Sequence, residues 1–139
     1  SRIEGAKEGR HGKASTKIAK TILEKVNFPK NKVEKVLLAV EMHDNDDLPD
    51  DVPLEVKIVH DADRLDGFGE IGIVRIAMVA NERGKNVWEV VRKVREGMRK
   101  RYEGLKLEFS KRIAEKYYKR AQDFVKRLEK YLRNGLTSC

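Results

Sequence analysis

The sequence predicts an all-α protein, and three observations favour that fold class. Apolar residues recur at helical spacing in several separate segments of the 139-residue chain. Short groups of Gly, Pro and Asn separate these segments, and no turn sequence typical of a β-hairpin lies between them. The length also suffices for one hydrophobic core. We therefore expect amphipathic helices packed into a bundle.

The first two predicted helices cover residues 13–26 and 30–43. Apolar positions of the first are Ala14, Ile18, Ala19, Ile22, Leu23 and Val26, and those of the second are Val33, Val36, Leu37 and Val40. Asn27-Phe28-Pro29 is expected to end the first helix. An acidic loop with two prolines then runs from Asp44 to Pro53, and long irregular loops often carry function.

A third helix is predicted from Asp51-Val52-Pro53 to about Leu65. Asp51 suits an N-cap position, and Pro53 suits the first helical turn. The residues expected to break this helix are Gly67, Gly69 and Gly72. Residues 71–80 are apolar almost all round and could form a buried strand or a buried helix. Their glycine and alanine content, within an otherwise helical chain, favours the helix.

Two further helices are predicted in the C-terminal half. Asn86-Val87-Trp88-Glu89 is close to a capping box and indicates a helix start. The last helix spans about 105–133, with Gly135 as a plausible stop. Its predicted apolar stripe is Phe109, Ile113, Tyr117, Ala121, Phe124, Leu128 and Tyr131. We expect this stripe to fold back onto its own domain, with antiparallel dimerisation as the alternative.

Composition and charge restrict the class of protein. No apolar stretch approaches the ~18 residues of a membrane span, and no secretory signal is visible. The single Cys139 cannot form an internal disulfide, which fits a cytoplasmic protein. The abundance of Lys and Glu resembles thermophile surface chemistry. The net charge of +8 is uneven, because residues 41–66 are acidic and residues 83–133 are basic. The basic part is a solvated face or a surface for nucleic acid or anionic lipid.

Two residues with metal-binding chemistry fall at apolar helical positions. Asp63 lies four residues after Val59 and seven after Val56, so we expect it on their inward face. A buried carboxylate costs several kcal/mol (order of magnitude) unless a cation or hydrogen-bond donors meet it. His43 lies three residues after Val40 on the preceding helix. The alternatives are a hydrogen-bonded core histidine and a helix-capping aspartate.

Three motifs together resemble a known family. They are His11-Gly12-x-x-Ser15, then Val40-Glu41-Met42-His43, then a run from Glu55 to Arg75 that contains Asp61-Ala62-Asp63-Arg64-Leu65-Asp66 and Gly72-Ile73-x-Arg75. This combination is similar to the HD-domain metal-dependent phosphohydrolases, in the branch with a D-A-D-R-L-D segment. The resemblance covers roughly residues 11–80. It divides the chain into an HD-type portion, 1–82, and a C-terminal helical extension, 83–139.

The resemblance implies a helical bundle around a divalent metal. Asp63 resembles the family's late metal-bound aspartate, and His11 and His43 resemble two histidines that precede it. His43-Asp44 fits a later single-histidine motif better than the family's His-Asp pair. That pair and an early histidine would lie before residue 1, so we expect the chain to be a piece of a longer or processed protein.

The implied activity is phosphohydrolysis of a nucleotide or another small phosphoester. Mn, Fe, Co, Ni, Mg or Zn suits mixed His and Asp ligands, and such a metal polarises a phosphoryl oxygen and activates water. Asp61 and Arg64 are the catalytic candidates, and Asp61 either orients a histidine or caps the turn at Gly67. Lys13, Lys17 and Arg75 are candidates for the substrate phosphate. Salt bridges are the alternative role of each cation.

Two other functions stay open at this point. One is a non-catalytic module for nucleotide binding, metal binding or assembly, with homo-oligomers possible. The other is a nucleic-acid-binding helical domain.

Overall fold

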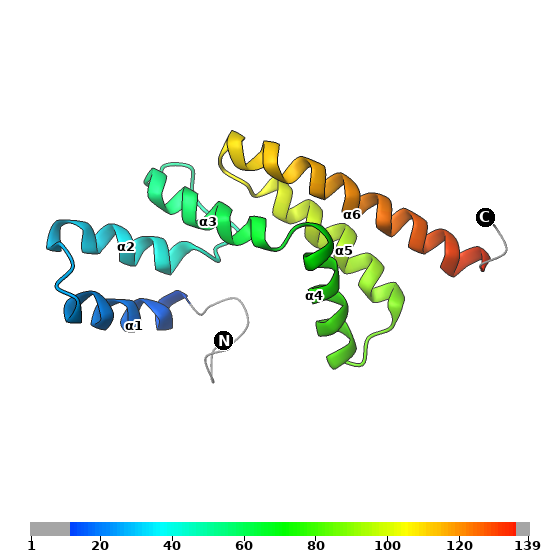
Figure 1. Ribbon diagram of the computed structural model, residues 1–139, viewed down its shortest axis with the longest axis horizontal. Helices are drawn as coiled ribbons and strands as arrows, with labels where there is room; N and C mark the ends of the chain where they lie inside the picture. The colour runs from blue at the N-terminus through cyan, green and yellow to red at the C-terminus, as the bar shows by residue number, and fades with distance from the viewer. Residues whose placement is uncertain (1–11, 136–139) are drawn as a thin grey trace. The chain divides into compact units, whose positions relative to one another are not determined.

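The protein is all-α. The computed structural model describes residues 12–135, and these form six α-helices and no strand (Figure 1). Helix bounds lie within a few residues of those predicted from the apolar spacing. Residues 71–80 are helical, which confirms the preferred alternative for that segment.

The chain divides into two compact units, residues 1–63 and 64–139. The sequence suggested a division after residue 82. In the structure α4 (Gly69–Glu82) packs with α5 (Val87–Glu103) and α6 (Glu108–Asn134), so the second unit begins earlier, within α3 (Leu54–Asp66).

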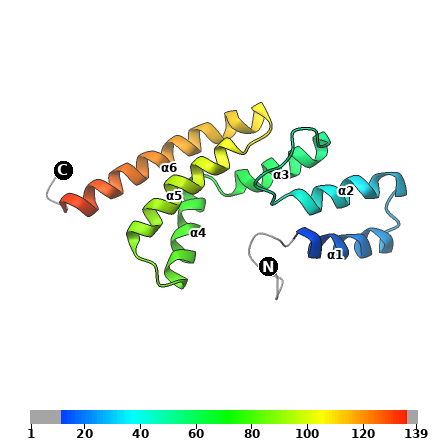
Figure 2. The ribbon, with the colours of Figure 1, turned by 180° about the vertical axis from the view of Figure 1, so that it is seen from behind.

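The first unit pairs α1 (Gly12–Lys25) with α2 (Lys30–Met42) in an antiparallel hairpin (Figures 1 and 2). Asn27, at a φ of 50°, reverses the chain between them. A small apolar cluster joins α2, the following loop and α3, and its buried members are Ala39, Leu48 and Val56. The carbonyl of Pro53 accepts bonds from the amides of Val56 and Lys57, which starts α3 near the predicted proline.

The second unit is a three-helix arrangement in which α5 and α6 run side by side and α4 packs against both (Figures 1 and 2). Its buried core is Phe68, Val91, Val94, Met98, Leu105, Ala114, Ala121 and Val125. The rings of Tyr102 and Tyr118 stack with centroids 4.9 Å apart, which also joins α5 to α6. Asn86 caps α5 by accepting from the amide of Glu89 at 3.1 Å, as the capping-box pattern predicted. Gly135, at a φ of 73°, ends α6.

The third helix ends at Asp66, just before the predicted glycines, and Gly72 lies inside α4, where an added Cβ would stand only 1.9 Å from the carbonyl oxygen of Gly67. The predicted stripe on α6 is correct only in part, because Ala121 and Leu128 pack in the core. Phe109, Phe124 and Tyr131 are exposed, while Ser110, Ala114, Ala121 and Val125 form the buried face. Small side chains let α5 and α6 approach closely, so the large residues lie at the sides of the contact.

Candidate active site

The buried face of α3 differs from the predicted one. Val56, His60 and Arg64 are buried at successive four-residue steps, and Asp61 is buried beside them. Val59 is exposed, and so is Asp63, which corrects the inward position expected for that carboxylate. Val56 therefore lies at one edge of the buried sector, and polar residues occupy the centre. A pattern based on apolar residues could not locate such a face.

His60 and Asp61 form a buried pair in the first unit. Their side chains are 0% and 1% exposed, and Nδ1 of His60 lies 3.0 Å from Oδ1 of Asp61. Nε2 of His60 lies 3.1 Å from the carbonyl oxygen of Asn45. A carbonyl only accepts, so Nε2 carries a proton and donates it.

The side chains of His60 and Asp61 are hydrogen-bond partners, which makes the burial of both polar groups tolerable. Asp61 thus contacts a histidine, His60, that was not among the site residues predicted from the sequence.

The loop after α2 lies at the other end of this hydrogen-bond chain. His43, half-buried, has Nδ1 2.7 Å from the carbonyl oxygen of Val40, so Nδ1 carries a proton and donates it. The Oδ2 atom of Asp44 is buried. The side chain of Asn45 accepts from the amide of Asp47 at 3.0 Å, forming a tight turn. This turn presents the Asn45 carbonyl to His60.

The cationic candidates are distributed over both units. Lys17 is exposed on α1 in the first unit. Arg64 and Arg75 belong to the second unit, where Arg75 pairs with the exposed carboxylate of Asp66. Arg64 is only 5% exposed, and an added Cβ at Gly104 would stand 3.1 Å from its Cζ. Its guanidinium therefore packs under the C-terminus of α5. His11 lies outside the described residues, and nothing is described of the Lys13 side chain.

The structure thus connects the loop carrying His43 and Asp44 with Asp61, through His60. His60 was missed as a site residue because a polar side chain adds nothing to an apolar pattern. Its four-residue spacing from Val56 and from Arg64 was the signal that could have identified it. Within residues 12–135, no three His, Cys, Asp or Glu side chains are grouped so that they could hold a metal ion.

Comparison of the chain with protein-family models, with curated proteins and with solved structures finds no match in any of the three. In the part of the chain that the structure describes, no helix has the length and apolar character needed to cross a membrane.

Proposed function

We propose that this chain carries part of the site of a divalent-metal-dependent phosphohydrolase of the HD-domain type. Its substrate class would be a nucleotide or another small phosphoester. The main support is the hydrogen-bond chain from Asp61 through His60 to Asn45. It joins the D-A-D-R-L-D segment to the loop of His43-Asp44, and these are two of the three motifs behind the family resemblance.

The donor chemistry that the resemblance implies suits a divalent ion. Aspartate and imidazole ligands match borderline metals such as Mn²⁺, Co²⁺ or Ni²⁺. One of the implied ligands lies outside residues 12–135. His11 is the candidate that the sequence supplies. A bound metal would polarise a phosphoryl oxygen and lower the pKa of a coordinated water.

The chain's own residues would orient the groups of the site and balance their charge. His60 fixes the Asp61 carboxyl group through a direct hydrogen bond, so that carboxyl enters the site in one orientation. Arg75 belongs to the second unit and pairs there with the exposed carboxylate of Asp66, and an exposed ion pair is exchanged at little cost. Arg64 is buried against the Gly104 backbone, which favours a structural role.

The test combines a metal titration of the 139-residue chain with a hydrolysis screen on a longer chain that carries an early histidine and a His-Asp pair upstream of Ser1. We expect Mn²⁺, Co²⁺ or Ni²⁺ to bind in calorimetry and to support phosphate release from nucleotides or a phosphomonoester. Asp61→Asn and Asp63→Asn, measured separately, identify which aspartate matters. Asp47→Asn, an equal charge change on an exposed loop residue, is the matched control.

Three results would distinguish the possibilities. Loss of metal binding and turnover in one of the two aspartate variants, with Asp47→Asn unchanged, supports the phosphohydrolase. Metal or nucleotide binding without any turnover supports the non-catalytic module instead. Hydrolysis that survives chelation, and is equal in all three variants, contradicts a metal-dependent activity at this site.

A further inference from the structure

The outward face of α6 is a line of positive charge. The second unit has 20 Lys and Arg against 10 Asp and Glu. Six exposed cations follow one face of α6 at steps of three, four and seven residues, and we call them the cationic stripe: Arg112, Lys116, Lys119, Lys126, Lys130 and Arg133. The stripe lies opposite the buried Ala114, Ala121 and Val125. The 27-residue helix is ~40 Å long, so the stripe could follow several phosphates of an extended polymer.

Most of this charge is not neutralised by neighbours. Lys119 pairs with Glu115 at 2.5 Å, and Arg133 stands over the Trp88 ring at 5.7 Å. Among the described residues, Arg112, Lys116, Lys126 and Lys130 have no acidic partner. A row of like charges without partners raises the potential along the helix and attracts a polyanion.

Exposed aromatic rings lie along one edge of the stripe. Phe109, Phe124 and Tyr131 are each at least 38% exposed, and Arg120 and Arg127 alternate with them along the helix. Aromatic rings beside a cationic groove are the usual means of binding unpaired bases, because any base can stack on a ring. Paired bases of a duplex are already stacked and would not use these rings.

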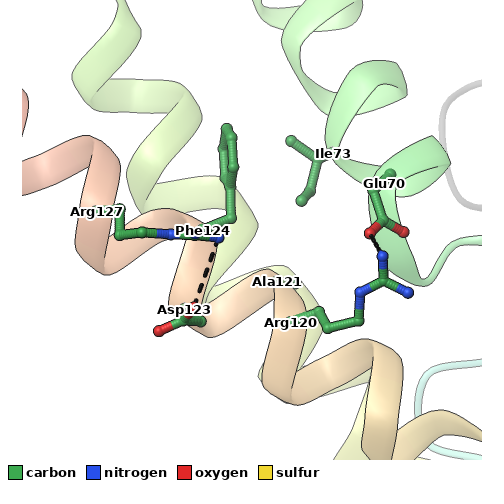
Figure 3. Close-up of a pocket in the computed structure, with 7 residues that line it drawn as sticks. All are labelled: Glu70, Ile73, Arg120, Ala121, Asp123, Phe124 and Arg127. Carbon is green, nitrogen blue, oxygen red and sulfur yellow. Dashed lines mark ion pairs between the residues drawn. The ribbon is translucent and has the colours of Figure 1, made fainter.

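A pocket of about 270 Å³ lies between α4 and α6 at the middle of this edge. Figure 3 shows Phe124 of α6 and Ile73 of α4 on its two sides, with ion pairs at its rim. Arg120 pairs with Glu70, and Arg127 lies 3.5 Å from Asp123. All four charged side chains are at least half exposed, so a phosphate could replace either carboxylate at little cost.

We propose that α6 binds single-stranded nucleic acid, with the phosphate backbone along the cationic stripe and one base in the pocket against Phe124. An anionic membrane fits this surface less well. An interfacial helix buries its apolar face in lipid, whereas the main apolar face of α6 is already covered by α5. This binding surface lies wholly in the second unit and is independent of the phosphohydrolase proposal.

The test is fluorescence anisotropy of the 139-residue chain with a labelled oligothymidylate or oligouridylate of about 16 nucleotides. The logarithm of the binding constant should fall linearly with the logarithm of salt concentration, with a slope of about −0.7 per phosphate contact. Lys126→Gln with Lys130→Gln should make that slope shallower by about 1.4. Lys20→Gln with Lys25→Gln, an equal charge change on exposed residues of α1, is the control and should leave the slope unchanged.

The pocket is tested by Phe124→Leu and Phe124→Tyr. Leucine should weaken oligonucleotide binding about tenfold, and tyrosine should retain it, because only tyrosine keeps a ring for stacking. Circular dichroism checks that both variants keep their helices. Heparin, which has no bases, should bind both variants equally.

Several results would overturn the proposal. They are binding that is too weak to detect at low salt, equal loss in the α1 control, and equal affinity of wild type and Phe124→Leu for the oligonucleotide. Tighter binding to phosphatidylserine vesicles than to the oligonucleotide would assign the surface to a membrane instead.

Discussion

His60 donates a hydrogen bond from Nε2 to the carbonyl oxygen of Asn45, 3.1 Å away, and so ties the turn after α2 to α3. Its other ring nitrogen contacts Asp61. One buried imidazole therefore satisfies a backbone carbonyl and a carboxyl group at the same time, and its removal would leave both without that partner.

Replacing His60 tests this relationship. His60→Ala should lower the free energy of unfolding by ~3 kcal/mol, because it creates a cavity and removes the partner of a buried carboxyl group. His60→Gln should cost less, since the amide can still donate to Asn45. Denaturant unfolding followed by circular dichroism measures both. Asp63→Asn, an exposed change on the same helix, should stay within ~0.5 kcal/mol of wild type. Equal stability of His60→Ala and Asp63→Asn would contradict the structural role.

Two alanine substitutions in the second unit should act in opposite directions. At Gly72 an added Cβ would stand 1.9 Å from the Gly67 carbonyl oxygen and 2.8 Å from Cε of Met98, so backbone must move. Gly72→Ala should therefore lose more than ~2 kcal/mol. Gly97, in α5, has nothing within 4 Å of an added Cβ, and Gly97→Ala should gain up to ~1 kcal/mol from helix propensity. Denaturation midpoints of the pair provide the measurement, and a gain at Gly72 would show that α4 and the turn carrying Gly67 do not meet so closely.

The register of α6 can be tested by one overpacking substitution and one truncation. Ala121 is fully buried, so Ala121→Leu should force side chains apart and cost ~1–3 kcal/mol. Ile113 lies on the predicted stripe but is 38% exposed, and Ile113→Ala should cost less than a typical core truncation. Thermal unfolding at two protein concentrations reports both effects. A larger loss for Ile113→Ala would restore the register first expected from the sequence.

The ion pair of Arg95 with Glu129 joins α5 to α6 and predicts a pH dependence. The Arg95 guanidinium donates a hydrogen bond that lowers the pKa of Glu129 below its ordinary value. The ionised carboxylate therefore stabilises the folded protein above the ordinary pKa of about 4.3. This contribution should disappear as the pH falls below that value through the lower folded pKa.

Glu129→Gln is the corresponding variant. Its melting temperature should lie below that of wild type at neutral pH, and the two should converge in acid. Glu24→Gln, on exposed α1, is the matched control and should show no such convergence. A difference between wild type and Glu129→Gln that persists unchanged at pH values below the folded pKa would show that the pair is not electrostatic.

The sequence by itself determined the all-α class and the approximate ends of the helices. Those features depend on neighbours along the chain: a proline before α3, the Asn86 cap and Gly135 after α6 act within one or two turns. The sequence also determined that residues 41–66 are acidic and residues 83–133 are basic, because formal charge does not depend on folding.

Only the tertiary structure decided which faces α3 and α6 bury. On α3 the buried positions are largely polar, so the apolar pattern placed Asp63 on the inward face, whereas His60 and Asp61 are the buried residues. On α6 Ala114 and Ala121 are buried while Phe109, Phe124 and Tyr131 are exposed, because close helix packing selects for size. Burial depends on what another segment presents across the contact, and that information lies in residues far away in the chain.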